Sequence, residues 1–137
     1  MHSSLVPIIS KQRFDYTFLS GTTFQQVTLA AALDLVSYKS VFLMVRVHRI
    51  SLSSGQTFVF TLENTLPSEE DPQEFTDSSS PILSVTVPSG TSAPKLLSGN
   101  GTDPLAFGKL VLTANQGSSS GTPMYAEMSV CLLGRSE

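Results

Sequence analysis

The stretch YKSVFLMVRVHRISL, residues Tyr38 to Leu52, decides the fold class of this chain. From Val41 to Val47 every second residue is Val or Leu, which is the period-two pattern of a β-strand. The intervening positions form a second face that also carries bulky side chains: Phe42, Met44, Arg46, His48 and Ile50. A strand that is bulky on both faces is expected in the middle of a sheet.

The residues that follow predict a β-hairpin. Ser53 to Gln56 have the length and the composition of a hairpin turn. Beyond the turn, Phe58, Phe60 and Leu62 share one face and alternate with a second set of side chains. The sequence therefore predicts a second strand that runs antiparallel to the first.

Alternation recurs through the rest of the chain. Further strands are expected over residues 14–18, 24–33, 82–87, 95–97, 107–114 and 124–132. Ala30 to Leu33 also fit a helical turn, but the preceding Val27-Thr28-Leu29 favours a strand. No helical period is sustained, and turn-forming residues separate the strands at fairly even spacing.

This pattern predicts an all-β fold, an antiparallel β-sandwich that is jelly-roll-like and has seven or eight strands. The expected core consists of inward-facing residues from several strands: Val41, Leu43, Val45, Phe58, Phe60, Leu110, Met128 and Val130. The absence of Trp and of paired cysteines disfavours an antibody-type sandwich.

A length of 137 residues fits one domain, which we place at residues 14–137 behind an N-terminal arm of residues 1–13. The arm carries four apolar side chains before the first clear strand: Leu5, Val6, Ile8 and Ile9. Exposed apolar residues of this kind usually contact a partner. The alternative is that the arm adds an edge strand to its own sheet.

Composition narrows the choice of function. Charged residues make up only 14% of the chain and the net charge is −3, which suits a subunit packed into an assembly or a secreted β-protein. The eight Lys and Arg residues are scattered singly, so phosphate binding to nucleic acid is not expected. No basic, apolar leader and no apolar run of about 18–20 residues is visible, so no membrane partner is expected. We expect synthesis in the cytoplasm, with any outside location reached by another route, such as incorporation into a particle.

No catalytic, cofactor or metal site is predicted. Gly117 to Gly121 match the G-x-S-x-G elbow, but that motif needs a following helix, and here Pro123 and a strand follow. His48 lies on the central strand, where a packed histidine is expected, and Cys131 is a small strand residue. No Cys or His pair has zinc-binding spacing. The chain is therefore not expected to be an enzyme.

An acidic, proline-flanked stretch interrupts the strands between Asn64 and Pro81. Carboxylates gathered in a loop can hold calcium, but this spacing lacks the glycine and the alternating ligands of an EF-hand. We expect a solvated loop that contacts a partner through Glu69, Glu70, Asp71 and Phe75.

Two segments resemble small β-sandwich proteins among the structural genes of tailed phages. One is Leu33-Asp34-Leu35, then Tyr38, then the strand Phe42-Leu43-Met44-Val45-Arg46-Val47-His48. The other is Leu66-Pro67-Ser68-Glu69-Glu70-Asp71-Pro72-Gln73-Glu74-Phe75. The resemblance covers about the middle third of the chain and implies a head, decoration or tail-associated role with no catalytic residues.

The sequence thus predicts a non-catalytic virion structural protein, a capsid decoration or a minor capsid or tail component. Its expected partners are copies of itself, a major capsid protein or another particle protein. The alternative is a carbohydrate- or ligand-binding β-sandwich that uses the same loops. Sugar sites need aromatic platforms, and a chain with no Trp and three Tyr offers few of them.

Overall fold

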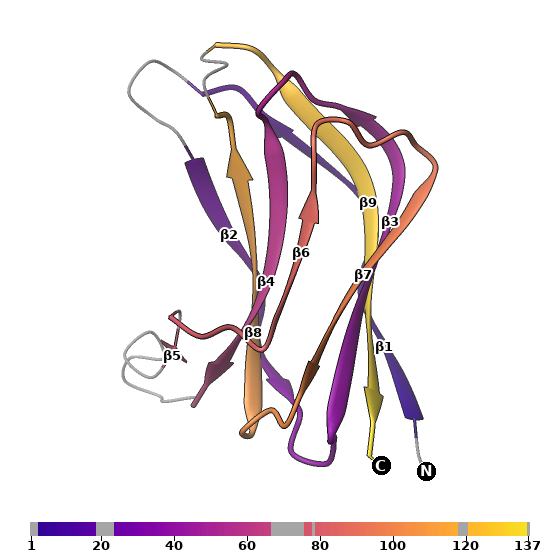
Figure 1. Cartoon of the computed structure of the whole chain (residues 1–137), viewed down its shortest axis with the longest axis vertical. Coiled ribbons are helices and arrows are strands. Elements are labelled where there is room, and N and C mark those ends of the chain that lie inside the picture. Colours follow the sequence, from indigo (N-terminus) through magenta and orange to yellow (C-terminus); the bar gives the residue numbers. More distant parts are fainter. Residues whose placement is uncertain (1–2, 19–23, 67–75, 78, 118–120, 137) are drawn as a thin grey trace.

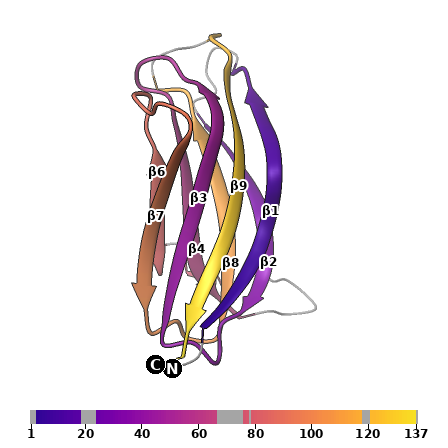
Figure 2. The same cartoon turned by 90° about the vertical axis from the view of Figure 1, so that its right-hand side faces the viewer.

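Two antiparallel sheets face each other across one core in the computed structural model of the chain (Figures 1 and 2). The structure describes residues 3–18, 24–66, 76–77, 79–117 and 121–136. Sheet A has the order β1-β9-β3-β7, formed by Ser3–Tyr16, Met124–Arg135, Ser40–Ser51 and Lys95–Thr102. Sheet B has the order β2-β8-β4-β5, formed by Phe24–Asp34, Phe107–Asn115, Thr57–Thr65 and Thr76–Asp77, and β6 (Leu83–Val87) also pairs with β4.

The connectivity is that of a jelly roll. Strands from the two ends of the chain pair in nested order, β1 with β9, β2 with β8, β3 with β7 and β4 with β6. The chain therefore folds back on itself at the connection between β4 and β6. Successive strand pairs lie alternately in sheet A and in sheet B. The predicted all-β, antiparallel, jelly-roll-like sandwich is confirmed.

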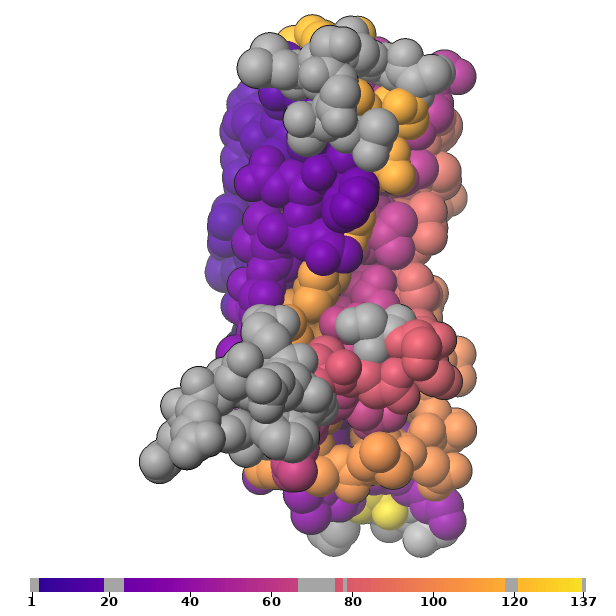
Figure 3. Space-filling view, turned by 90° about the vertical axis from the view of Figure 1, so that its left-hand side faces the viewer, coloured from indigo at the N-terminus to yellow at the C-terminus, as the bar shows by residue number. Residues whose placement is uncertain are grey.

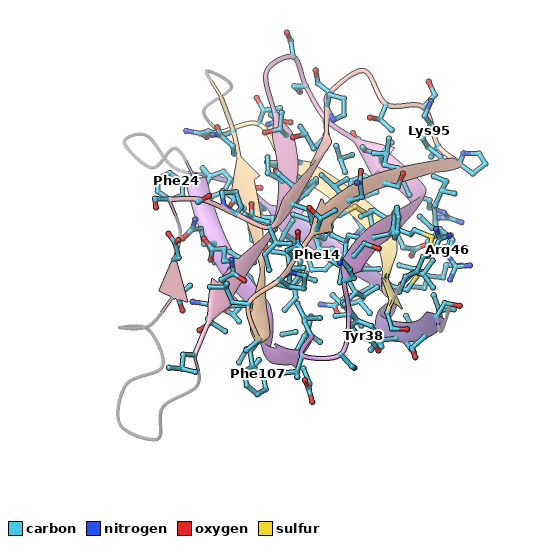
Figure 4. The ribbon with its side chains drawn as sticks, turned by 60° about the horizontal axis from the view of Figure 1, so that its bottom comes forward. Phe14, Phe24, Tyr38, Arg46, Lys95 and Phe107 are labelled. Atoms are coloured by element: carbon cyan, nitrogen blue, oxygen red, sulfur yellow. The ribbon has the colours of Figure 1, made fainter. Side chains whose placement is uncertain are left out.

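The core lies between the sheets and is built from alternate residues of each strand. All eight residues that were expected in the core are at most 1% exposed. Phe14, at the end of β1, adds an aromatic ring between the layers, as Figure 4 shows. Burial of this apolar surface is the main force that holds the two sheets together.

The largest differences in extent from the prediction are in β7 and β1. β7 runs from Lys95 to Thr102, although only residues 95–97 were expected to be extended. β1 begins at Ser3 and pairs with β9 over its length, so the boundary placed after residue 13 falls inside a continuous strand. Within the described ranges no helix is long and apolar enough to cross a membrane.

The two long sides of the sandwich are built differently. On the β6–β7 side, glycines bring the sheets close together, because a Cβ on Gly99 would lie 2.8 Å from Val85 Cγ2 and one on Gly101 would lie 2.3 Å from the Ile82 carbonyl oxygen. On the β1–β2 side the strands carry larger apolar side chains that are only partly buried against the core: Val6, Ile8, Ile9, Leu29, Ala30 and Leu33. The sandwich is thus tight along one side and incompletely covered along the other.

Candidate interaction surface

The outward side of sheet A, which we call the A face, carries an apolar centre. Cross-strand pairing places Leu5 beside Leu133 and Leu133 beside Phe42, and the next outward row pairs Cys131 with Met44. Because partners in a sheet share a face, these side chains form one continuous patch. Leu5 is 61% exposed and Leu96, one row further along on β7, is 60% exposed.

Two shallow depressions adjoin on this face. One, of about 260 Å³, is lined by Leu5, Met44, Arg46, Leu96 and Cys131. The other, of about 290 Å³, is lined by Arg46, Val47, His48, Pro94, Lys95 and Leu96. They share Arg46 and Leu96, so a single apolar and cationic surface runs from β1 to the start of β7.

The fold brings together charged residues that are far apart in the sequence. Six of the eight Lys and Arg residues lie on the strands of sheet A and all six are exposed: Lys11, Arg13, Arg46, Arg49, Lys95 and Arg135. The same strands contain only two carboxylates, Asp15 and Glu127. Figure 4 shows Arg46 and Lys95 on the sheet A side of the molecule, away from Phe24 on β2.

At the β1 end of this basic surface, the positive charges have partners on sheet A itself. Arg13 Nε donates to Asp15 Oδ2 at 2.6 Å, and this hydrogen bond raises the pKa of Arg13 above its ordinary value. The Arg13 guanidinium also lies 4.2 Å from the centre of the Tyr125 ring, and Lys11 Nζ lies 3.8 Å from Glu127 Oε1.

The β3–β7 end contains fewer carboxylates, although Arg49 lies opposite Glu127 in the register of β3 and β9. Across the part of the chain that the structure describes, Arg46, Arg49 and Lys95 have no carboxylate within ion-pair distance. Arg135 lies over the Phe42 ring at 4.8 Å, which leaves its charge directed at an aromatic face. The A face therefore combines an apolar centre with the guanidinium groups of Arg46 and Arg49, and the Lys95 ammonium lies at its β7 margin, because Lys95 pairs with the inward-facing Val47.

One buried hydroxyl fixes the shape of the A face. Ser129 on β9 is 6% exposed, and its Oγ accepts a hydrogen bond from the Lys11 backbone N–H at 3.0 Å. The same Oγ lies 2.7 Å from His48 Nε2. Register shifts interrupt β1 between Ile9 and Gln12 and β3 between Val47 and Arg49, so two bulges meet at Ser129 and bend the neighbouring strands there.

A second exposed apolar group lies at the end of the sandwich where the described chain starts and stops, at the bottom of Figure 1. Leu105 is 80% exposed, and Val36 and Leu66 are 65% and 57% exposed. Leu105 is held in place because its N–H donates to Asn64 Oδ1 at 3.1 Å. A depression of about 230 Å³ separates Leu105 from Leu66.

The predicted contact residues of the arm divide between two surfaces. Leu5 lies on the A face, whereas Val6, Ile8 and Ile9 pack partly against the core along the β1–β2 side. Glu69, Glu70, Asp71 and Phe75 lie outside the described residues. The outward side chains Phe42, Met44 and Leu133 were not predicted as contacts, although the second bulky face of the β3 sequence was a signal for the first two.

The structure shows what surrounds the sequence motifs that were not expected to form a catalytic or metal site. Strand β9 begins at Met124, so Gly121 is followed by a strand and not by the helix of a nucleophile elbow. Ser119 lies outside the described residues. His48 is half-buried on β3 and contacts Ser129, and among the residues that can be placed no three metal-binding side chains come together.

Comparison with known proteins gives structural neighbours only. No protein-family model matches the chain, and no curated protein matches its sequence. Three similar structures come from infectious bursal disease virus: a point mutant of VP2 in T=1 particles (TM-score 0.61, 12% identity), the Gt strain (0.59, 15%) and the VP2 subviral particle (0.57, 16%). Each match covers 98% of this chain and 32% or 33% of the other.

The chain thus spans about a third of the length of these viral proteins. At 12% to 16% identity the likeness shows the fold alone. This β-sandwich has the arrangement of a domain that occurs in proteins of virus particles.

Proposed function

We propose that this chain is a non-catalytic structural subunit of a virus-type particle and binds its neighbours through the A face. The observation that carries the proposal is the composition of that face, an exposed apolar centre beside three cations without acidic partners in the described chain. Leucine side chains that remain exposed on a folded sheet, as Leu5 and Leu96 do, are typical of a surface that a protein covers.

The A face fits a protein better than it fits a nucleic acid. Phosphate binding needs a continuous track of cations, and the middle of this face is apolar, with Leu5, Met44 and Leu133 between the charged residues. A protein partner with an apolar patch and acidic residues at its rim would satisfy both parts of the surface.

The structural neighbours support the viral part of the proposal. They are proteins of virus particles, and 98% of this chain corresponds to about a third of each of them. Within this class we propose a decoration, minor capsid or tail-associated role of the tailed-phage type, in the virion, with copies of itself or another particle protein as partner.

Leu5 belongs to the A face in this proposal. Val6, Ile8 and Ile9 contact a partner along the β1–β2 side, and the acidic residues Glu69, Glu70 and Asp71 with Phe75 provide a further contact between β4 and β5. The exposed group around Leu105 provides a separate contact at one end of the sandwich.

Light scattering of the 137-residue chain over a concentration series tests the proposal. We expect association into dimers or larger species. The double variant Leu5→Asp/Leu96→Asp places two carboxylates in the apolar centre and should raise the apparent dissociation constant at least tenfold. The control is Ser84→Asp/Thr86→Asp, which adds the same charges at exposed positions of β6 on sheet B.

Retained circular dichroism and melting temperature would show that the variants fold. A chain that stays monomeric at millimolar concentration, and that does not co-sediment with a native particle, would contradict the assembly role. It would favour the carbohydrate- or ligand-binding alternative. That alternative has little support at present, because Phe24 is the one exposed aromatic residue in the described ranges.

A further inference from the structure

Strand β2 is a long sheet edge without the usual protection. It is the outermost strand of sheet B, and no described strand pairs with its free side. The ten residues from Phe24 to Leu33 contain no charge, no proline and no glycine. Natural proteins normally prevent such an edge from pairing with another chain by placing lysine, proline or a short strand there.

The other sheet edges of this molecule carry that protection. β1 contains Pro7, which has no N–H to donate, and Lys11, whose backbone φ of 44° breaks the regular edge. β6 has only five residues, and β7 begins with Lys95 and contains two glycines. The contrast singles out β2 as the edge that is suited to accept a strand.

The first half of β2 is regular enough to pair. Phe24 to Thr28 match Asn115 to Val111 of β8 one for one, and the register shifts begin only after Thr28. Every side chain of this segment is at least partly exposed, and Phe24 is 54% exposed. Figure 3 shows β2 at one margin of the sheet B side, with its surface open to the viewer.

We infer that β2 pairs antiparallel with β2 of a second copy of this chain, across a two-fold axis at Gln26. This inference rests on the proposed assembly role and names the partner and the register. In this register Phe24 of each copy lies opposite Thr28 of the other, an aromatic and β-branched pair that favours antiparallel sheets. Gln26 of one copy lies opposite Gln26 of the other, so the two side-chain amides can hydrogen-bond to each other.

The choice of a second copy follows from the charges. Two β2 strands in this register bring no charged residues together, because Asp34 lies beyond the paired segment. Pairing with β1 of another copy would instead place Pro7, Lys11 or Arg13 against an uncharged strand and lose hydrogen bonds at Pro7. The pairing would also cover part of the incompletely buried β1–β2 side.

Cysteine cross-linking tests the pairing and its register. The chain has one cysteine, Cys131, which lies on the A face, so a Cys131→Ala background removes it. Single cysteines are then introduced at positions 24 to 28, one in each variant. Two cysteines can form a disulfide only when their Cα atoms are within about 7 Å of each other.

We expect the yield of disulfide-linked dimer under mild oxidation to peak sharply at Gln26→Cys. A cysteine at position 25 or 27 should give little disulfide-linked dimer, because it would lie two residues along the strand from the same cysteine in the second copy. A flat, low yield across the five positions, or a peak at another position, would overturn the inferred pairing.

A lysine at the edge provides a second measurement that does not depend on cross-linking. Thr28→Lys should raise the dimer dissociation constant at least tenfold, because lysine on an edge strand opposes pairing. Thr86→Lys on β6, which is also an exposed site but lies on the opposite edge of sheet B, should leave the dimer dissociation constant unchanged. If Thr28→Lys associates like the unmodified chain while Leu5→Asp/Leu96→Asp does not, the β2 inference fails and the assembly role stands. A strictly monomeric chain overturns both.

Discussion

Gln56 is a fully buried polar residue at the end of the sandwich where the β3–β4 turn meets the residues before β9. Its Oε1 accepts from the Ser53 N–H at 2.7 Å and its Nε2 donates to the Thr122 carbonyl at 3.0 Å. Gln56→Ala leaves both backbone groups without these partners, so it should lower the free energy of unfolding by about 2–3 kcal/mol. Urea unfolding measures this loss, and the exposed Gln25→Ala should change stability by less than about 0.5 kcal/mol.

Gly101 occupies the tight side of the sandwich. A Cβ there would lie 2.3 Å from the Ile82 carbonyl oxygen, and a backbone atom of this kind cannot move aside as a flexible side chain can. Gly101→Ala should therefore cost at least about 2 kcal/mol. Gly90→Ala is the matched control, because nothing lies within 4 Å of a Cβ at Gly90 and the change should be close to neutral. Equal melting temperatures for the two variants would contradict this account of the β6–β7 side.

Tyr16 makes the free energy of unfolding depend on pH in the alkaline range. Burial raises the pKa of its hydroxyl above the ordinary value of 10.0. Between that ordinary value and the raised one, the unfolded chain loses the proton and the folded chain retains it, so stability is full below about pH 10 and falls above it. Denaturant unfolding from pH 9 to 11 should show a smaller decline for Tyr16→Phe than for the unmodified chain. Parallel declines would show that Tyr16 does not contribute.

At the scale of the strands, the Ser129 hydroxyl on β9 contacts both neighbouring strands, β1 and β3, in addition to their backbone pairing. Ser129→Ala removes the acceptor of the Lys11 N–H and the partner of His48 Nε2, so it should lower the free energy of unfolding by about 1–2 kcal/mol. The comparison is Ser98→Ala on the exposed side of β7, which should have little effect. Hydrogen exchange at the Lys11 amide should also become faster in Ser129→Ala, and an unchanged rate would count against this role for Ser129.

The strands also show what local pattern can and cannot predict. β3, β4 and β9 alternate strongly, and their positions and inward faces were correct because burial on one face enforces that period. β7 was predicted too short, since Ser98 to Gly101 have low strand propensity. Gly99 and Gly101 occupy this stretch because the neighbouring sheet leaves no room for a Cβ. That requirement comes from tertiary packing and cannot be read from the local sequence.

At the scale of the whole molecule, the A face was beyond the reach of sequence spacing. Its cations stand singly at positions between 11 and 135, and they meet only because the jelly roll brings β1, β3, β7 and β9 into one sheet. The apolar residues of the arm were recognised, but their division between the A face and the β1–β2 side depends on the register with β9. The fold class was therefore predictable from alternation, and the candidate surface was not.

The place of β9 also has a consequence for how the protein is made. β9 lies between β1 and β3, so the first and third strands to leave the ribosome have no shared neighbour until the last one follows. Sheet A, and with it the A face, can close only after translation has passed Arg135. Pairings between residues so distant in sequence form slowly, and until then the nascent chain presents the apolar sides of β1 and β3 to solvent. The topology thereby delays the formation of the A face until β9 has been made.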